Sequence, residues 1–322
     1  FLLAVALSLC GAYLLLVGWR LLRRNAYQVR GIVLKMDRSM RPPGVVVATL
    51  VVLLVAFLVH ASLVQYHTWA GRSHFEGLVG QRSRTAEAPE LERAIEHYRS
   101  ALSIGFVAPV DQRQELASLY LQQGNHASAG VLLHGILAED STHVEARYQL
   151  AGMAMQQGRK AEAMRHWQVV LERGRERTGG RSRALVARSA IDLGAAYAEG
   201  NQLQRAHVVY MQGLERVPED VSLLTALGAL EGRMGSDSAA ITHLREALRL
   251  GGESAVLHNN LGALYLRQGK QNEALGHFLE LIALKPSDAQ LRYTVGVLLA
   301  RSGRSAQAME HLEHAARLAP QD

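Results

Sequence analysis

The chain has 322 residues, of which 48% are hydrophobic and only 6% aromatic, and its formal net charge is +6. This length exceeds that of one ordinary domain and suits a helical repeat array joined to membrane segments. The single cysteine, Cys10, excludes a disulfide framework or a cysteine-based metal site within one chain. No nucleic-acid partner is expected, because much of the basic excess lies in one short loop and no aromatic–basic interleaving marks a strand-binding groove.

Residues 1–19 form an uncharged apolar run that is long enough to span a bilayer. A cleaved signal peptide is the competing interpretation of such a run at the N-terminus. However, Arg20, Arg23 and Arg24 follow directly, and no small-residue cleavage site with a polar start is present. We therefore expect a membrane anchor.

Residues 44–66 form a second apolar run, with Tyr66 and Trp69 where an aromatic belt is expected. The loop between the runs, residues 20–43, has one acidic residue, Asp37. Its seven basic residues are Arg20, Arg23, Arg24, Arg30, Lys35, Arg38 and Arg41. The two runs predict that residues 1–66 form a two-helix transmembrane hairpin in a bacterial inner membrane. Because short basic loops stay in the cytoplasm, the rest of the chain is predicted to lie in the periplasm.

A helical hairpin pattern occupies residues 255–288. An apolar stripe with helical spacing ends at Gly269, a second stripe follows, and Pro286 stops it. Small residues at Gly262 and Ala274 let the two predicted helices approach closely. One such hairpin cannot bury its own apolar face, so it needs neighbours.

The neighbours occur at a near-constant period of 34 residues. Six units cover residues 110–143, 144–177, 187–220, 221–254, 255–288 and 289–322. A degenerate unit contributes only a second half, with Ala94, Tyr98 and Ala101. This pattern resembles that of tetratricopeptide-repeat proteins over residues 75–322. The residues that match the family's characteristic positions are Leu261, Gly262, Tyr265, Ala274 and Phe278.

The predicted fold is therefore all-α. A transmembrane hairpin (1–66) leads through a bridging helix and the degenerate repeat (67–109) to an α-solenoid of six repeats (110–322). An insertion near residues 173–186 interrupts the period. It carries five arginines, Arg173, Arg175, Arg177, Arg181 and Arg183, which suit either a solvated loop or a contact with anionic lipid or an acidic partner.

The fourteen histidines do not predict a metal or haem site. Five of them share one position in successive second helices, namely His97, His166, His243, His277 and His311. Since each belongs to a different hairpin, we expect packing or surface roles. A second set, His60, His67 and His74, is spaced by seven and would share a face if the second span continued as a helix; its role stays open. No catalytic motif is present, so a non-enzymatic protein without cofactors is expected.

The candidate partner site is the groove that first helices line in tetratricopeptide domains. Arg233, Arg267 and Arg301 occupy the thirteenth position of the last three units, and Asn259 and Asn260 add amide groups near Arg267. Such a ladder suits a partner segment with carboxylates. Alternatively, the arginines cap the C-terminal ends of their own helices, where positive charge is favourable.

The overall layout resembles the PelE family, the tetratricopeptide subunits of the inner-membrane complex that makes the Pel exopolysaccharide. That resemblance implies a glycosyltransferase, a polysaccharide transporter and a cyclic-dinucleotide receptor as partners, and repeats in the cytoplasm. The layout is also similar to the CcmI-type assembly factors of cytochrome c maturation, which have periplasmic repeats. Both resemblances predict a membrane-anchored scaffold that docks other proteins.

Overall fold

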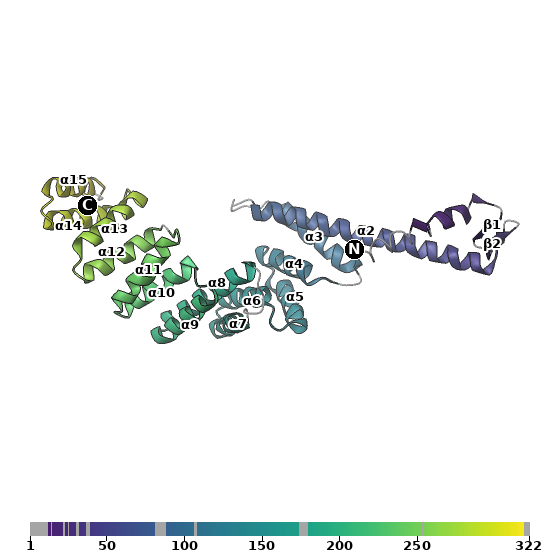
Figure 1. The fold of residues 1–322 in the computed structure, drawn as a ribbon, viewed down its shortest axis with the longest axis horizontal. Coiled ribbons are helices and arrows are strands. Elements are labelled where there is room, and N and C mark those ends of the chain that lie inside the picture. Colours follow the sequence, from purple (N-terminus) through teal and green to yellow (C-terminus); the bar gives the residue numbers. More distant parts are fainter. Residues whose placement is uncertain are drawn as a thin grey trace. The chain divides into compact units, whose positions relative to one another are not determined.

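The computed structural model describes residues 12–13, 15–21, 23–24, 26–29, 32–36, 39–80, 88–105, 108–173, 180–252 and 254–318. The chain divides into two compact units, Phe1–Leu132 and Leu133–Asp322. Helical hairpins follow one another along most of the described chain (Figure 1), which confirms the predicted helical repeat fold. The two-span hairpin is not established, because most of residues 1–19, including Cys10, lies outside the described residues.

The first unit contains a small sheet near its start, within a fold that is otherwise all-α as predicted. The described residues between 12 and 24 are mostly helical. Antiparallel strands β1 (Tyr27–Val29), β2 (Ile32–Met36) and β3 (Ser39–Met40) follow, in the order β1-β2-β3. The loop expected at 20–43 thus contains strands. The β-branched and apolar residues of β2 favour this conformation because Leu34 turns inward onto Val17, Leu21 and Val47.

Helix α2 (Pro42–Gly80) is the longest element and passes the point where the second span was expected to end. Its 39 residues correspond to about 58 Å at the α-helical rise. Among the described residues it contains the one helix long and apolar enough to cross a membrane, Pro42–Glu76, and only 6% of the most apolar stretch is buried in the structure. The helical residues that precede the sheet lie against α2, since a side chain at Gly18 would meet Val51 of α2.

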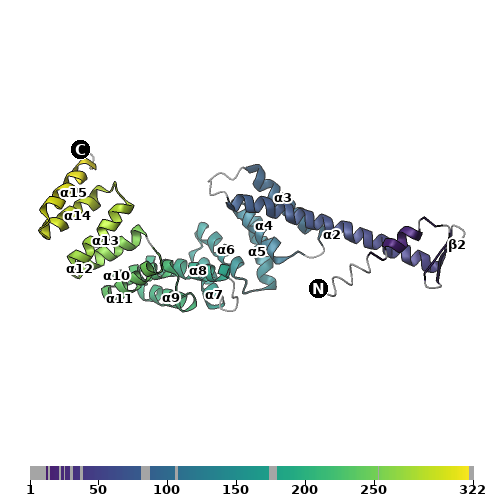
Figure 2. The same ribbon diagram turned by 45° about the horizontal axis from the view of Figure 1, so that its top comes forward.

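The end of α2 forms a helical pair with α3 (Ala88–Ile104), and the two lie side by side in both views (Figure 2). Gly71 of α2 faces the ring of Tyr98, where an added Cβ would lie 3.0 Å from Cδ2. Gly262 faces Phe278 in the same way, at 2.6 Å from Cε1. The degenerate unit therefore has a first helix, which sequence analysis had assigned to the bridge.

Short turns join the helices of the remaining hairpins. In chain order these helices are α4 (Val110–Gln122), α5 (His126–Glu139), α6 (Val144–Gln156), α7 (Lys160–Arg173), α8 (Gly180–Glu199), α9 (Leu203–Arg216), α10 (Val221–Arg233), α11 (Asp237–Arg249), α12 (Ala255–Arg267), α13 (Gln271–Leu284), α14 (Ala289–Arg301) and α15 (Ser305–Leu318). Gly269 has φ +74°, which only glycine adopts without strain, and this ends α12. Ser254 and Asp288 begin α12 and α14 by accepting hydrogen bonds from Leu257 N and Leu291 N.

Helix α8 starts seven residues before the expected unit boundary at 187 and absorbs part of the insertion. Of the five basic-insertion arginines, Arg173 and Arg183 are exposed. Arg175, Arg177 and the side chain of Arg181 lie outside the described residues. The solvated-loop and partner-contact interpretations of this insertion both remain predictions.

Candidate functional site

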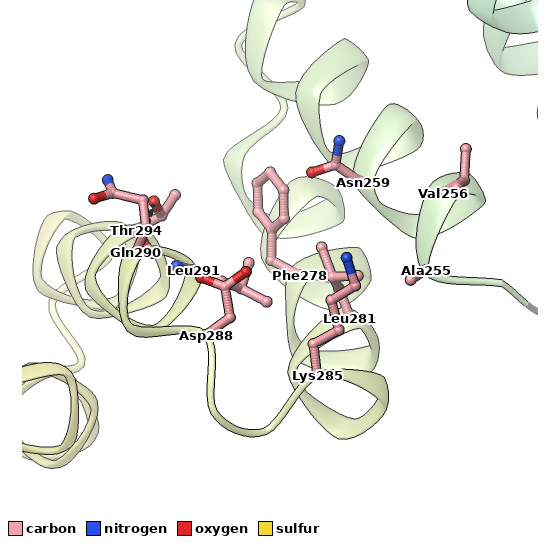
Figure 3. A pocket seen from close by; sticks show the side chains of 10 residues that line it. All are labelled: Ala255, Val256, Asn259, Phe278, Leu281, Lys285, Asp288, Gln290, Leu291 and Thr294. Carbon is pink, nitrogen blue, oxygen red and sulfur yellow. Dashed lines mark hydrogen bonds between the residues drawn. The ribbon is translucent and has the colours of Figure 1, made fainter. Parts of the chain in front are cut away.

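Three adjoining hollows lie along the first helices of the second unit. One, of about 430 Å³, is lined mainly by α8 and α10, and includes Ala195, Glu199 and Arg233. The next, of about 170 Å³, lies between α10 and α12. A third, of about 430 Å³, is formed by α12, α13 and α14 (Figure 3). We call this succession the first-helix groove.

The α12–α14 hollow combines an apolar floor with a polar rim (Figure 3). The floor consists of Phe278, Leu281 and Leu291, which are all buried. The rim carries amide, hydroxyl and charged groups, from Asn259, Gln290, Thr294, Lys285 and Asp288. The Asp288 carboxylate is engaged, because it accepts the Leu291 N–H at 2.9 Å. The hollow can therefore hold an apolar side chain whose backbone is hydrogen-bonded at the rim.

The α10–α12 hollow has small walls and cationic ends. Glycine and alanine residues line its sides, namely Gly228, Ala229, Gly232 and Ala263, while Arg233, Asn260 and Arg267 supply donors. The two asparagines predicted for the site do not act together, since Asn259 lines the α12–α14 hollow and Asn260 this one. As consecutive helical residues, their side chains leave α12 in different directions.

Arg267 is held by its own protein. Its guanidinium donates to Gly232 O at 2.8 Å and forms a two-point ion pair with Asp237, in which Nε lies 3.1 Å from Oδ2. A carboxylate already neutralises this charge. Sequence analysis did not find Asp237, which lies thirty residues away at the start of α11.

Arg233 makes the equivalent contact one unit earlier, since its Nη2 lies 3.5 Å from Ala198 O. Both arginines thus approach a carbonyl thirty-five residues earlier, near the C-terminal end of the previous first helix. Positive charge is favourable there. Arg233 and Arg267 therefore contact the C-terminal end of the preceding first helix, whereas the capping alternative placed each arginine at the end of its own helix.

Arg301 differs from the other two arginines. It is exposed, and it makes no hydrogen bond or ion pair with the residues that the structure describes. Arg233 also keeps most of its donors. The ladder of three equivalent arginines expected from the sequence therefore becomes two available cations, Arg233 and Arg301, on either side of a neutralised one.

The α6–α8 part of the same face carries partly buried acidic chemistry. The Tyr148 hydroxyl donates to Asp192 Oδ2 at 3.1 Å. Burial raises the pKa of Asp192, and burial with the neighbouring carboxylate raises the pKa of Tyr148 to about 12. Glu199 is exposed and pairs with Lys160. The face therefore changes from acidic side chains on α8 to basic ones on α10 and α14.

Two groups of histidines lie between the helices of their hairpins. His67 Nδ1 lies 3.0 Å from His97 Nδ1, and the His74 ring stacks on His97. Burial, followed by the charges of His67 and His74, lowers the pKa of His97. In the repeat of α12 and α13, His258 and Tyr265 flank His277 equivalently.

Two members of the open His60, His67 and His74 set therefore belong to the repeat packing. Glu231 likewise accepts hydrogen bonds from His207 and His243. Within the described ranges, no group of three histidine, cysteine or acidic side chains has the geometry to hold a metal ion.

Two tetratricopeptide-repeat family models match the sequence. One matches residues 120–189 and the other residues 225–289 and 259–322, so that together they cover just over half of the chain. The chain belongs to the tetratricopeptide-repeat family. Proteins of this family mediate protein–protein interactions, and as scaffolds they are typically non-enzymatic.

Several solved structures are similar to this chain, and one with a TM-score above 0.5 shows the same fold. The Pseudomonas aeruginosa pilF protein has a TM-score of 0.52 and 18% identity, over 70% of this chain and 96% of that one. YrrB, a tetratricopeptide protein with an unusual peptide-binding site, has a TM-score of 0.48 and 20% identity, over 59% and 93%. A MamA structure has a TM-score of 0.46 and 17% identity, over 54% and 91%. No curated protein sequence matches.

Proposed function

We propose that this protein is a membrane-anchored scaffold whose first-helix groove docks an extended, acidic segment of a partner protein. The observation that carries the proposal is the adjacency of two different hollows on α12. One offers donors from Arg233 and Asn260, and the other offers a buried apolar floor with an amide-bearing rim. A segment crossing α12 can place a carboxylate in the first and an apolar side chain in the second.

Charge complementarity favours an acidic partner over a basic one. Guanidinium groups bond carboxylates in pairs, and Arg233 and Arg301 keep free donors for this purpose. Each exposed ion pair contributes only about 0.2–1 kcal/mol, so recognition depends on several contacts together. Binding is therefore expected to weaken as salt rises.

The anchor part of the proposal rests on α2. Its exposed surface is apolar over most of its first half, with Val52, Leu53 and Phe57 all pointing away from the rest of the structure. A bilayer core of about 30 Å accommodates roughly twenty helical residues, which leaves the end of α2 free to pair with α3. The uncharged residues before Arg20 supply the second span in this proposal, as the sequence predicts.

The assembly that we propose is an inner-membrane complex for exopolysaccharide synthesis and export of the Pel type. The support is the predicted layout, in which the proposed membrane hairpin precedes a tetratricopeptide solenoid. A glycosyltransferase, a polysaccharide transporter and a cyclic-dinucleotide receptor would then be the partners. Assembly of cytochrome c, as by CcmI-type factors, is the second candidate, because the basic loop at 20–43 favours repeats in the periplasm.

Co-purification from membranes tests both levels of the proposal. The full chain is extracted in mild detergent and its partners are identified by mass spectrometry. We expect polysaccharide machinery, whereas haem-handling proteins would favour the second candidate. The double variant Arg233→Glu and Arg301→Glu should lose the same partners.

The matched control reverses two exposed arginines on second helices, Arg245 and Arg317, and should retain those partners. Unchanged capture by the Arg233→Glu, Arg301→Glu variant would move the binding surface elsewhere. The basic insertion, with Arg173 and Arg183 at its ends, is then the next surface to test.

A further inference from the structure

The small sheet before α2 exposes apolar side chains that the protein does not cover. Ile32 is 55% exposed and Met36 is 45% exposed, and Val33 and Met40 are also exposed. The neighbouring Trp19 is likewise exposed. Soluble domains bury such residues or scatter them singly, so their concentration over a few short strands indicates a surface that meets an apolar phase.

Basic residues surround these apolar side chains. Arg20, Arg23, Arg24 and Arg41 are all exposed, and none forms an ion pair with a carboxylate among the described residues. The Arg23 guanidinium lies 4.5 Å above the Trp19 ring, and Lys35 Nζ donates to Leu21 O at 3.0 Å. The cations are thus held close to the apolar patch and keep donors free for an anion.

The position of the sheet at the start of α2 is fixed by close packing. Leu34 packs with Val17, Leu21 and Val47, and a side chain at Gly44 would collide with the Leu34 carbonyl. Backbone hydrogen bonding adds to this, because Arg41 N donates to Leu34 O at 3.0 Å. The cationic apolar patch is therefore continuous with the exposed apolar surface of α2.

We propose that Trp19, the four arginines Arg20, Arg23, Arg24 and Arg41, and strands β2 and β3 form an interfacial site that binds the phosphate headgroups of anionic phospholipids. The apolar side chains of β2 and β3 enter the acyl boundary, while Arg20, Arg23, Arg24 and Arg41 bond the headgroup phosphates. Exposed Trp19 and its cation–π partner Arg23 lie where aromatic residues mark membrane interfaces. This proposal rests on the anchor part of the proposed function.

A lipid explains both halves of the surface. Free phosphate would satisfy the arginines and leave Ile32 and Met36 in water. An acidic protein would bind the arginines but would not cover the exposed apolar surface that the sheet shares with α2. Only a phospholipid presents a diffuse anionic layer directly beside hydrocarbon, in the same order as the cations and apolar groups of this segment.

Tryptophan quenching in nanodiscs tests the proposal on the full chain. The background variant Trp69→Phe, Trp167→Phe leaves Trp19 as the one fluorophore of its kind. Quenching by brominated phosphatidylglycerol is compared with quenching by equally brominated phosphatidylcholine in mixed bilayers. We expect roughly twofold stronger quenching by the anionic lipid, because each nearby cation enriches it around the segment.

The variant Arg20→Gln, Arg23→Gln, Arg24→Gln, Arg41→Gln should abolish this preference without loss of helical content. A control removes four exposed arginines of the second unit that lie outside the basic insertion, namely Arg165, Arg245, Arg304 and Arg317, and should keep the preference. Equal quenching by both lipids in the background chain would overturn the headgroup site and leave the anchor intact. No quenching by either lipid would overturn both.

Inorganic phosphate, added at constant ionic strength, separates the two sources of the anion. A lipid site predicts an unchanged preference, since soluble phosphate lacks the apolar half of the interaction. Loss of the preference at millimolar phosphate would identify a soluble-anion site and contradict the lipid assignment.

Discussion

At the scale of single residues, helix approach depends on glycines at one repeated position. An added Cβ at Gly262 would lie 2.6 Å from Phe278, and at Gly296 it would lie 2.7 Å from Leu312. The Phe278 ring is buried and the Leu312 side chain is partly buried, and each lies on the second helix of its hairpin. The repeat therefore selects glycine for close approach at these sites, and not for backbone freedom.

Replacing Gly262 by leucine should destabilise the protein by about 1–3 kcal/mol, because the hairpin must open to admit the side chain. Thermal unfolding of the full chain, followed by circular dichroism, measures the loss. Gly276→Ala in the adjacent helix is the matched control, since nothing lies within 4 Å of an added Cβ there. It should stabilise the protein by roughly 0.5–1 kcal/mol through helix propensity. Equal stability of Gly262→Leu and the unsubstituted chain would contradict the packing.

The half-buried histidine His277 gives the repeats a pH dependence. Burial, and then the charge of His258, lowers the pKa of His277 from 6.5. The folded state therefore prefers the neutral ring, whereas the unfolded chain takes up a proton near pH 6.5. Stability is complete above pH 6.5 and falls as the pH drops towards the lower pKa of the folded state.

We expect the melting temperature to fall between pH 7.5 and pH 5, and His277→Gln to reduce that fall. His207→Gln is a control, because this histidine is bonded to the Glu231 carboxylate instead of lying beside another imidazole. A pH profile that His277→Gln leaves unchanged would argue against the histidine pair as its source.

At the scale of secondary-structure elements, α2 performs two tasks. Its first half presents an apolar exterior, and its last turns build the first helical pair with α3. A polar network holds that pair to α4, because Tyr98 donates to Glu115, Arg72 pairs with Glu115, and Gln112 donates to Thr68 at 3.0 Å. A continuous helix transmits orientation directly from the proposed span to the first repeat.

Gly71→Leu should detach α3 from α2, since Tyr98 leaves no room for a side chain. Amide hydrogen exchange in α3 should accelerate by about one to two orders of magnitude, which corresponds to a loss of roughly 1–3 kcal/mol. Ser73→Leu adds a comparable side chain at an exposed position of the same helix and should leave exchange unchanged. Similar exchange in both variants would show that α3 does not depend on this contact.

At the scale of the whole molecule, the sidedness of the repeats is the property that most restricts the choice of partners. The basic loop at 20–43 predicts a periplasmic solenoid, whereas the PelE resemblance implies a cytoplasmic one. We expect alkaline phosphatase fused after Asp322 to be active in the bacterial host. A fluorescent cytoplasmic fusion with silent phosphatase would reverse this prediction and favour cytoplasmic partners of the Pel type.

The sequence by itself determined the helical hairpins, because their signals are local. Apolar stripes at helical spacing, Gly269 with positive φ and the capping residues Ser254 and Asp288 act within a few positions of one another. The 34-residue period then located the repeats. The period did not predict the first helical pair. The connection between α2 and α3 is longer than in the other hairpins, so Gly71 and its partner Tyr98 are farther apart in the sequence than Gly262 and Phe278.

Only the tertiary structure decided which charges remain available for a partner. Asp237 neutralises Arg267, and Arg233 reaches a carbonyl of the preceding repeat, while Arg301 stays unpaired among the described residues. These three arginines are identical in the repeat pattern. They differ because ion pairs form between side chains thirty or more residues apart, at distances set by how one hairpin packs on the next, and such long-range geometry leaves no periodic signal in the sequence.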